Sequence, residues 1–247
     1  MRRPRPSASR WPAALLLGLA VLSAAGSASA QRDAIPSDYP HSLMRDLAAL
    51  LAALDRDPSD VGLLTRLADL YLNIADDLYT DAQDRLAAYE EGARTAERAI
   101  ELREANADAH FLYAAALGSA ARLQGPASAA LVLRNVKRHV ARAIELRPDH
   151  APALQMMGGL LAELPRFLGG DPEAAERYLM RAIAADGDYT NARILLAKLY
   201  LKQGRVDAAR LQLRAVVGAA RPHYPYAWAR RFKPEAERLL KSLDERE

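Results

Sequence analysis

The sequence contains no cysteine. This absence excludes disulfide bonds, zinc sites with cysteine ligands, thiol catalysis and an acylated N-terminal cysteine. Catalytic signatures are missing too: the five histidines form no His-Glu-x-x-His or i, i+4 pair, and there is no P-loop, Gly-x-Ser-x-Gly or Gly-x-Gly-x-x-Gly motif. We therefore expect a protein that is not an enzyme, with no catalytic residues, no metal site and no cofactor.

An excess of either charge is also missing once the first 30 residues are set aside. Four arginines there precede an apolar run, WPAALLLGLAVLSAA, and a small-residue segment, GSASA. This pattern is typical of an export signal cleaved after Ala30, and the run is shorter than the roughly 20 residues that span a bilayer. Without those four basic residues the chain has 30 Lys and Arg against 31 Asp and Glu, so we expect no nucleic-acid partner.

The rest of the chain divides into a short linker and one long helical region. The polar segment QRDAIPSDYPHS forms the linker at 31–42, and residues 43–247 form the repeat domain. Apolar residues recur with helical period throughout 43–247, and no segment alternates with a period of two. We therefore predict one all-α domain that is stable through packing alone.

A repeated pattern predicts how these helices pair. The segments AERAIELREANADA (96–109), VARAIELRPDHAPA (140–153) and LMRAIAADGDYTNA (179–192) share a small residue, a β-branched residue, a polar break and a new helix. Equivalent positions are separated by 46, 44, 39 and 34 residues, as shown by Ala53, Ala99, Ala143, Ala182 and Val216. The last interval equals the tetratricopeptide repeat length.

We predict an all-α, tetratricopeptide-like α-solenoid of about four helical hairpins with enlarged tips. A leading helix at 42–55 and a C-terminal capping helix near 234–244 complete it. Asp-Pro pairs at 57–58 and 171–172 are each expected to open a helix, with Asp as N-cap and Pro at the first position. Small and aromatic repeat positions are expected to pack or turn the chain rather than bind a ligand. These positions are Ala68, Tyr71, Ala99, Ala143, Ala182, Ala197, Tyr200, Gly204 and Ala209.

The intervals longer than 34 residues place extra chain inside three hairpins. The last hairpin spans nine residues from Tyr200 to Ala209, whereas equivalent spans in the others are 21, 19 and 14. The extra residues fall in 73–90, 118–134 and 163–171. Insertions at one repeat position project from one edge of a solenoid, so the tips are expected to wall a recess. The alternative is that they only lengthen the helices and pack on one another.

Candidate ligand-binding residues follow from this tip hypothesis. Arginine grips carboxylates through paired hydrogen bonds, and an aromatic residue in a tip adds apolar surface. His110, at the start of a helix, either faces the groove or has a structural role. The candidates are His110, Tyr113, Arg122, Arg166 and Phe167. The tip residues that define the loops are Gly118, Gly125, Pro126, Leu164, Pro165, Gly169, Gly170 and Asp171. The double glycine could cradle an anion, although a turn alone explains it.

Residues 60–220 resemble a known family. The segments HFLYAAALGSAARLQGPASA and MGGLLAELPRFLGGD, with the run Leu-Pro-x-x-x-Gly-Gly-Asp, are similar to the T component of TRAP transporters, the TatT family. The resemblance implies a periplasmic, non-enzymatic helical protein that forms trimers and has a ligand-accessible cleft. It also implies a TRAP solute-binding P component as partner and a small organic or hydrophobic acid as ligand. Because the chain lacks the lipoprotein cysteine, we expect a soluble periplasmic form.

Other interpretations remain open at this point. The same Leu-Pro-x-x-x-Gly-Gly-Asp run is also similar to eukaryotic regulators of microtubule dynamics, whose cellular setting conflicts with an export signal. A generic tetratricopeptide scaffold for envelope proteins, with peptides in its concave face, is a further alternative. An enzyme that uses Arg, His and Glu groups would show two convergent titratable groups with shifted pKa values.

Overall fold

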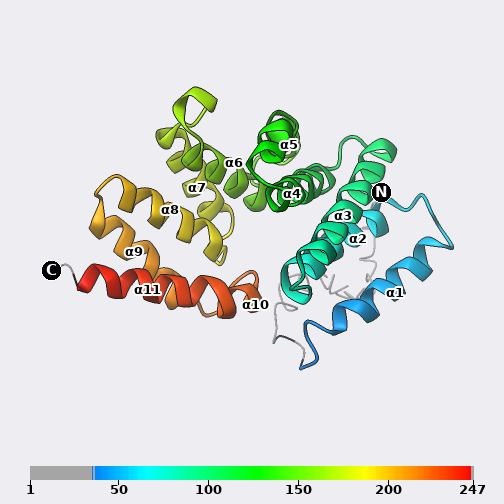
Figure 1. Cartoon of the computed structure of the whole chain (residues 1–247), viewed down its shortest axis with the longest axis horizontal. Coiled ribbons are helices and arrows are strands. Elements are labelled where there is room, and N and C mark those ends of the chain that lie inside the picture. Colours follow the sequence, from blue (N-terminus) through cyan, green and yellow to red (C-terminus); the bar gives the residue numbers. More distant parts are fainter. Residues whose placement is uncertain (1–34, 36, 246–247) are drawn as a thin grey trace, which may run out of the picture. The chain divides into compact units, whose positions relative to one another are not determined.

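The computed structural model describes residue 35 and residues 37–245, and these residues are helices joined by turns, with no strand among them. The predicted export signal at 1–30 lies outside the described residues. No helix in the described part of the chain is both long and apolar enough to cross a bilayer. The prediction of an all-α solenoid of helical hairpins is confirmed (Figure 1).

Four hairpins follow a leading helix, and a C-terminal helical segment follows the hairpins. The hairpins are α2 with α3, α4 with α5, α6 with α7, and α8 with α9. The helices are α1 Ser42–Leu54, α2 Val61–Asn73, α3 Ala82–Leu102, α4 Ala107–Gln124, α5 Pro126–Leu146, α6 Ala151–Glu163, α7 Pro172–Ala185, α8 Thr190–Lys202, α9 Val206–Val217, α10 Pro225–Ala227 and α11 Lys233–Asp244. Two π-helical turns, η1 Ile74–Leu78 and η3 Trp228–Phe232, and one 3₁₀ turn, η2 Arg166–Leu168, complete the elements.

Small side chains at the repeat positions bring paired helices close together. Six alanines at these positions are completely buried: Ala68, Ala99, Ala143, Ala182, Ala197 and Ala209. Tyr200 is buried and Tyr71 half-buried, while Gly204 has a φ of +72°, which favours glycine in the turn between α8 and α9. Because the alanine side chain is only a methyl group, the backbones of paired helices can approach closely at these positions. Large apolar residues pack around the alanines and form the core.

Helix starts follow local capping chemistry, with one correction. Asp171 caps α7 through Ala174 N–H at 2.9 Å, and Pro172 is the first helical residue, as predicted. The pair at 57–58 does not open a helix: α2 begins at Val61, and its cap is Asp60, which accepts from Leu63 N–H at 3.0 Å. Asp57 instead accepts from Ser59 in the preceding turn, so the sequence contained two candidate caps three residues apart.

The extra residues of the enlarged hairpins are built in two ways. In the first two hairpins they lengthen helices: α3 and α5 have 21 residues and α4 has 18, against 13 and 12 in α8 and α9. In the third hairpin they form a loop from Leu164 to Asp171 that contains η2. The alternative of lengthened helices therefore describes the first two tips, and only the third is a projecting loop.

The C-terminal segment returns to the N-terminal hairpin. Tyr226 of the segment packs edge-to-face on Tyr39 with ring centroids 4.7 Å apart, and Arg231 lies 3.4 Å from Asp77. Tyr39 also donates a 2.6 Å hydrogen bond to Asp77, whose side chain is 9% exposed. Asp77 thus connects the start of the described chain, the π-turn η1 and the π-turn η3. We call Tyr39, Asp77, Tyr226 and Arg231 the clasp.

Candidate functional site

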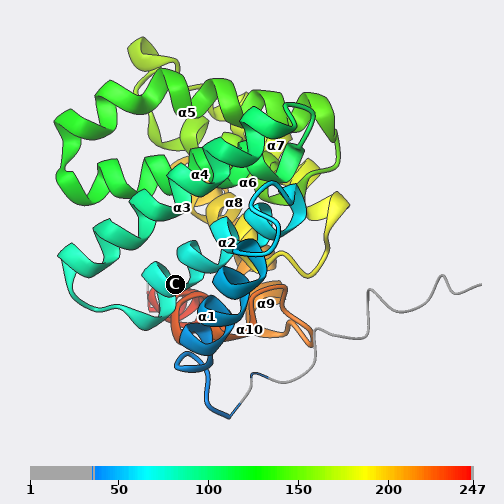
Figure 2. The same ribbon diagram turned by 90° about the vertical axis from the view of Figure 1, so that its right-hand side faces the viewer.

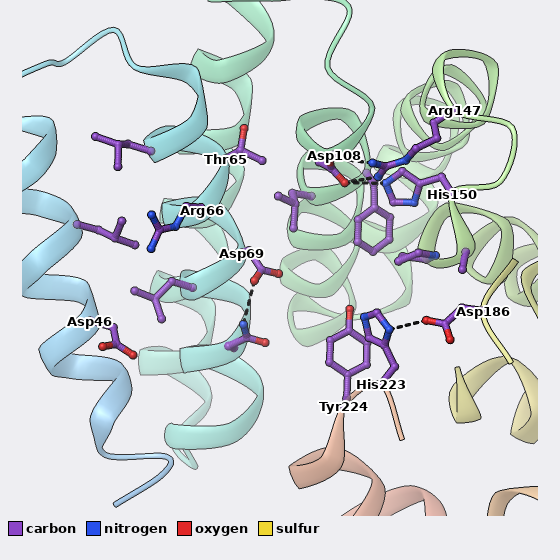
Figure 3. Close-up of a pocket in the computed structure, with 18 of the residues that line it drawn as sticks. Asp46, Thr65, Arg66, Asp69, Asp108, Arg147, His150, Asp186, His223 and Tyr224 are labelled. Carbon is purple, nitrogen blue, oxygen red and sulfur yellow. Dashed lines mark hydrogen bonds and ion pairs between the residues drawn. The ribbon is translucent and has the colours of Figure 1, made fainter. Parts of the chain in front are cut away.

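A recess of about 860 Å³ lies where the first helices of the hairpins begin. Its walls come from α1, α2, the starts of α4 and α6, the end of α7 and residues 223–224 (Figure 3). Its lining residues are Asp46, Ala49, Leu50, Ala53, Leu63, Thr65, Arg66, Asp69, Leu70, Asn73, Asp108, Phe111, Leu112, Arg147, Asp149, His150, Ala151, Pro152, Ala185, Asp186, His223 and Tyr224. The recess is lined by both apolar and charged side chains.

In the second and third hairpins the recess and the enlarged tips lie at opposite ends, whereas along α2 the recess extends to Asn73 at the start of the first tip. In α4, Asp108 in the first turn lines the recess, whereas Gln124 ends the helix at the tip. Eighteen helical residues separate these ends by about 27 Å. The repeat intervals therefore indicate the enlarged tips but not this recess, because the recess forms between helices of different hairpins and adds no residues to any interval.

One wall of the recess carries a carboxylate that is fully paired. Arg147 grips Asp108 with two guanidinium nitrogens, one of them 3.2 Å from Oδ2. His150 Nδ1 accepts from the Ala153 N–H, which leaves the ring proton on Nε2, 3.2 Å from Asp108 Oδ1 and away from the ideal hydrogen-bond direction. His150 and then Arg147 lower the pKa of Asp108 to about 2, against the opposing effect of burial.

A second acidic group is paired at the lower side of Figure 3. Asp186 Oδ2 lies 2.6 Å from His223 Nδ1, and the His223 backbone N–H donates to Asp188 O at 2.9 Å. His223 also stacks edge-to-face against Tyr224, with ring centroids 4.5 Å apart. These contacts fix the two residues that close this part of the recess wall.

Asp69 lacks such a partner. Its side chain points from α2 into the recess, and it accepts one 3.2 Å hydrogen bond, from Asn73 Nδ2 (Figure 3). Asp69 is exposed to solvent, but the protein atoms of the recess walls around its carboxylate disfavour the charged form and raise the pKa of Asp69; nearby Asp108 adds to the shift. Within the described part of the chain Asp69 forms no ion pair, so its charge is not neutralised.

The charge of the whole lining is acidic. It contains five aspartates and two arginines, and one of the arginines, Arg147, is occupied by Asp108. The other, Arg66, is exposed on α2 and has no ion pair among the described residues. No group of three or more His, Asp or Glu residues suited to a metal is found in the residues that the structure describes.

The five candidate ligand-binding residues do not line this recess. His110 is 4% exposed: its Nδ1 lies 2.8 Å from His139 Nδ1 and its Nε2 lies 2.9 Å from Glu104 O. Tyr113 accepts a 3.1 Å hydrogen bond from Asn135. His110 is thus packed against α5, which corresponds to the structural alternative considered for it.

The other candidates lie on the exposed tips. Arg122 donates to Ser119 Oγ at 3.4 Å, and Arg166 lies 4.0 Å from Glu173. Phe167, at 85% exposure, is among the most exposed large apolar side chains. A ligand role for these residues stays a prediction.

The tip residues shape the turns. A Cβ added to Gly118 would make only ordinary contacts with Val136 and Met156, while Gly125 has a φ of +116° and Pro126 begins α5. In the third tip, Gly169 has a φ of +84°, and a Cβ on Gly170 would lie 1.8 Å from Leu164 O. Leu164, Pro165 and the double glycine therefore form a tightly closed loop, which ends at Asp171.

A weak signal for the recess was present in the repeat copies. Each copy carries an aspartate soon after its anchor alanine, but at different offsets: Asp108, Asp149 and Asp186 follow their anchors by 9, 6 and 4 residues. Because these positions are not equivalent in the repeat, the pattern indicates acidic residues near each connection but does not predict that they line one recess. Asp69, inside a helix, carried no comparable signal.

Comparisons with known proteins agree with the repeats and identify a family. Residues 33–163 match the family model described as "Regulator of microtubule dynamics protein 1-3", and residues 166–230 match a tetratricopeptide repeat model. The chain is 29% identical over 163 residues to regulator of microtubule dynamics protein 1 of Bos taurus, covering 60% of this chain and 51% of the relative. The Mus musculus protein is also 29% identical, with 60% and 53% covered. The chain thus spans about half the length of these relatives.

A solved structure supports the fold alone. A thermophilic tetratricopeptide protein from Thermus thermophilus is 20% identical, with a TM-score of 0.59 over 80% of this chain and 91% of that protein. The family model covers more than half of the present chain. The chain is a tetratricopeptide repeat protein, and it belongs to the regulator of microtubule dynamics protein 1-3 family.

Proposed function

We propose that this chain is a non-enzymatic adaptor that captures a segment of a partner protein carrying basic side chains in its acidic recess. The observation that carries the proposal is Asp69, whose carboxylate faces the recess and forms no ion pair within the described residues. An ammonium or guanidinium group brought by a partner would neutralise it. Because the recess walls and nearby Asp108 raise the pKa of Asp69, a cation bound there would favour the charged carboxylate.

The dimensions and walls of the recess suit a few side chains of an extended segment. Binding sites for ligands usually enclose about 300–1,000 Å³ and combine apolar walls with a few polar groups. Leu63, Leu70 and Phe111 supply apolar surface on both sides of Asp69. A partner segment with basic residues next to apolar residues would match both features.

The hydrogen-bond arrangement supports binding rather than catalysis. The only hydroxyl-bearing aliphatic side chain of the lining, Thr65, donates to Val61 O at 2.7 Å and accepts from Asn106 at 3.0 Å. His150 and His223 are each held beside an aspartate. Because the Thr65 hydroxyl is engaged on both sides, it is not placed as a nucleophile.

The test is binding of labelled peptides, measured by fluorescence anisotropy. Lysine-containing apolar peptides should bind more tightly than matched peptides with glutamate, and binding should weaken with added salt. Asp69→Asn should weaken binding about tenfold, the effect of about 1.4 kcal/mol. Asp207→Asn, at an exposed position in the first turn of α9, removes the same charge outside the recess and should have no effect.

Polymerised tubulin belongs in the same binding panel, since the relatives are named for microtubule dynamics. Equal binding by wild type and Asp69→Asn would contradict the recess as the site, whichever partner is used.

The narrower role expected from the TatT resemblance is a second candidate. The recess volume also falls in the range of small-molecule sites, which is compatible with an organic acid bound by an exported accessory protein of a TRAP system. Arg66 is the cation of the recess that is available for an anionic ligand. Mass spectrometry of small molecules retained by the purified protein tests the ligand. A binding assay with a cognate solute-binding component tests the partner, and a measurement of molecular mass in solution tests for a trimer.

A further inference from the structure

The outer face of α5 is basic and apolar, and neither the recess nor the proposed adaptor role uses it. Residues 126–144 of α5 contain no Asp or Glu, whereas they contain Arg134, Lys137, Arg138 and Arg142. Arg142 is neutralised by Glu104 and Glu145, with its Nε 2.7 Å from Glu104 Oε1. The other three cations form no ion pair within the described part of the chain.

These three cations share one side of the helix. Positions 131, 134 and 138 follow the i, i+3, i+7 spacing of a single helical face, and 137 lies at its border. Arg138 donates a 2.7 Å hydrogen bond to Asn135, which leaves its positive charge uncompensated. The face is therefore a local positive surface on a chain whose remaining charges nearly cancel.

Two large apolar side chains protrude beside these cations. Leu131 on the same helical face is 84% exposed, and Phe167 at the tip of the third hairpin is 85% exposed. The tip loop adjoins α5, because a Cβ on Gly169 would lie 3.1 Å from Lys137 Nζ. In Figure 2, α5 crosses the upper part of the view and the loop after α6 rises above it. Transfer of such side chains from water into an apolar phase is favourable.

We propose that this basic-apolar face, made of Leu131, Arg134, Lys137, Arg138 and Phe167, docks peripherally on an anionic phospholipid bilayer. Positive side chains would meet the phosphate headgroups, and the protruding leucine and phenylalanine would enter the boundary with the acyl chains. The apolar groups project singly from a helix and a loop tip and do not line a groove. A bilayer accommodates separate protrusions, whereas a folded partner requires a complementary cavity for each.

Vesicle flotation tests the proposal with the full chain. Phosphatidylcholine vesicles containing phosphatidylglycerol should bind the protein, pure phosphatidylcholine vesicles should bind it much less, and salt should weaken the difference. The triple variant Arg134→Gln, Lys137→Gln, Arg138→Gln should lower the partition coefficient about 100-fold, at about fivefold per charge. All variants keep the apolar run of the first 30 residues, so differences between them report on the face.

A matched variant separates this face from the general effect of charge. Lys202→Gln, Arg214→Gln, Arg221→Gln removes three exposed charges elsewhere and should bind like the wild type. Loss of binding by both triple variants, or by neither, would overturn the proposal. Binding to a polyglutamate peptide but not to anionic vesicles would overturn it in favour of an acidic protein partner.

The apolar part is tested by insertion. A Phe167→Trp variant should show a blue-shifted tryptophan emission with anionic vesicles, beyond any change in the wild type. Phe167→Ser with Leu131→Ser should weaken binding at high salt more than Leu211→Ser, at a 66% exposed position on α9. An unshifted emission spectrum would show that the loop stays in water and would contradict docking through Phe167.

Discussion

At the scale of the residue, Asp69 represents a conflict between stability and binding. Its carboxylate is desolvated by the recess walls and has one hydrogen bond, from Asn73, in place of an ion pair. A raised pKa in the folded state means that folding disfavours the charged form. Ionisation of Asp69 therefore lowers the stability of the fold, a cost that is common in binding sites.

We predict that Asp69→Asn raises the melting temperature at pH 7. An aspartate whose pKa is raised on folding binds its proton more tightly in the folded protein than in the unfolded chain. The free energy of unfolding therefore falls as pH rises above the unfolded pKa, near 3.8. Thermal melts should show the gain at pH 7, and it should shrink as pH falls towards 4. A variant that is less stable than the wild type at pH 7 would contradict this account.

Individual residues also show what the sequence can and cannot reveal. Completely buried repeat alanines such as Ala143 and Ala182 were predictable, because their spacing is that of helices that approach closely. His110 was ambiguous because its role depends on His139, 29 residues away, and no sequence spacing specifies that contact. Asp69 resembled any solvated helix residue, since only the other walls of the recess desolvate it.

At the scale of the element, the loop from Leu164 to Asp171 explains the proline and double glycine in its sequence. The Gly170 N–H donates to Pro165 O, and the Asp171 N–H donates to Leu161 O, both at 3.0 Å. Gly170 passes so close to the Leu164 carbonyl that no side chain fits. The loop is closed by its own backbone, and Asp171 then caps α7.

Gly170→Ala should therefore lower the free energy of unfolding by about 2 kcal/mol. The added methyl group would displace the loop and weaken the two backbone hydrogen bonds, each worth about 1 kcal/mol. Urea denaturation measures the change. Gly187→Ala is the control, because a Cβ there meets no atom within 4 Å; it should shift stability by less than about 0.5 kcal/mol. Equal effects of the two substitutions would contradict the steric explanation.

The lengths of elements were only partly predictable. The leading helix was expected at 42–55 and occupies Ser42–Leu54, because its apolar periodicity is regular. The prediction that three hairpins contain extra residues was also correct. Periodicity did not show, however, that the extra residues of two hairpins would lengthen the helices. Packing against a neighbouring helix decides whether extra residues continue a helix for two further turns or form a loop of equal length. Such packing is not a property of the local sequence.

At the scale of the whole described chain, the clasp joins parts that are far apart in sequence. Asp77 and Arg231 are separated by 154 positions, and Tyr39 approaches the same carboxylate from the other end of the chain. Desolvation raises the pKa of Asp77, while Tyr39 and Arg231 act in the opposite direction. Nothing in the repeat pattern predicted this contact, because the repeats specify neighbours only.

Tyr39→Phe should lower the free energy of unfolding by about 1–2 kcal/mol, because it removes a hydrogen bond to a carboxylate that is nearly buried. Hydrogen exchange of residues 225–232 should become faster, since the C-terminal segment loses part of its anchor. Tyr79→Phe is the control: within the described residues its hydroxyl makes no hydrogen bond. Unchanged exchange of 225–232 in Tyr39→Phe would show that the clasp does not hold that segment.

The clasp also limits how this chain can change in length. Solenoids usually tolerate gain or loss of a hairpin, because each hairpin contacts only its neighbours. Here, duplication or deletion of one hairpin would carry Arg231 away from Asp77 and leave that carboxylate desolvated without its cation. A change in the number of repeats in this protein would therefore have to be accompanied by loss of the Asp77–Arg231 pair.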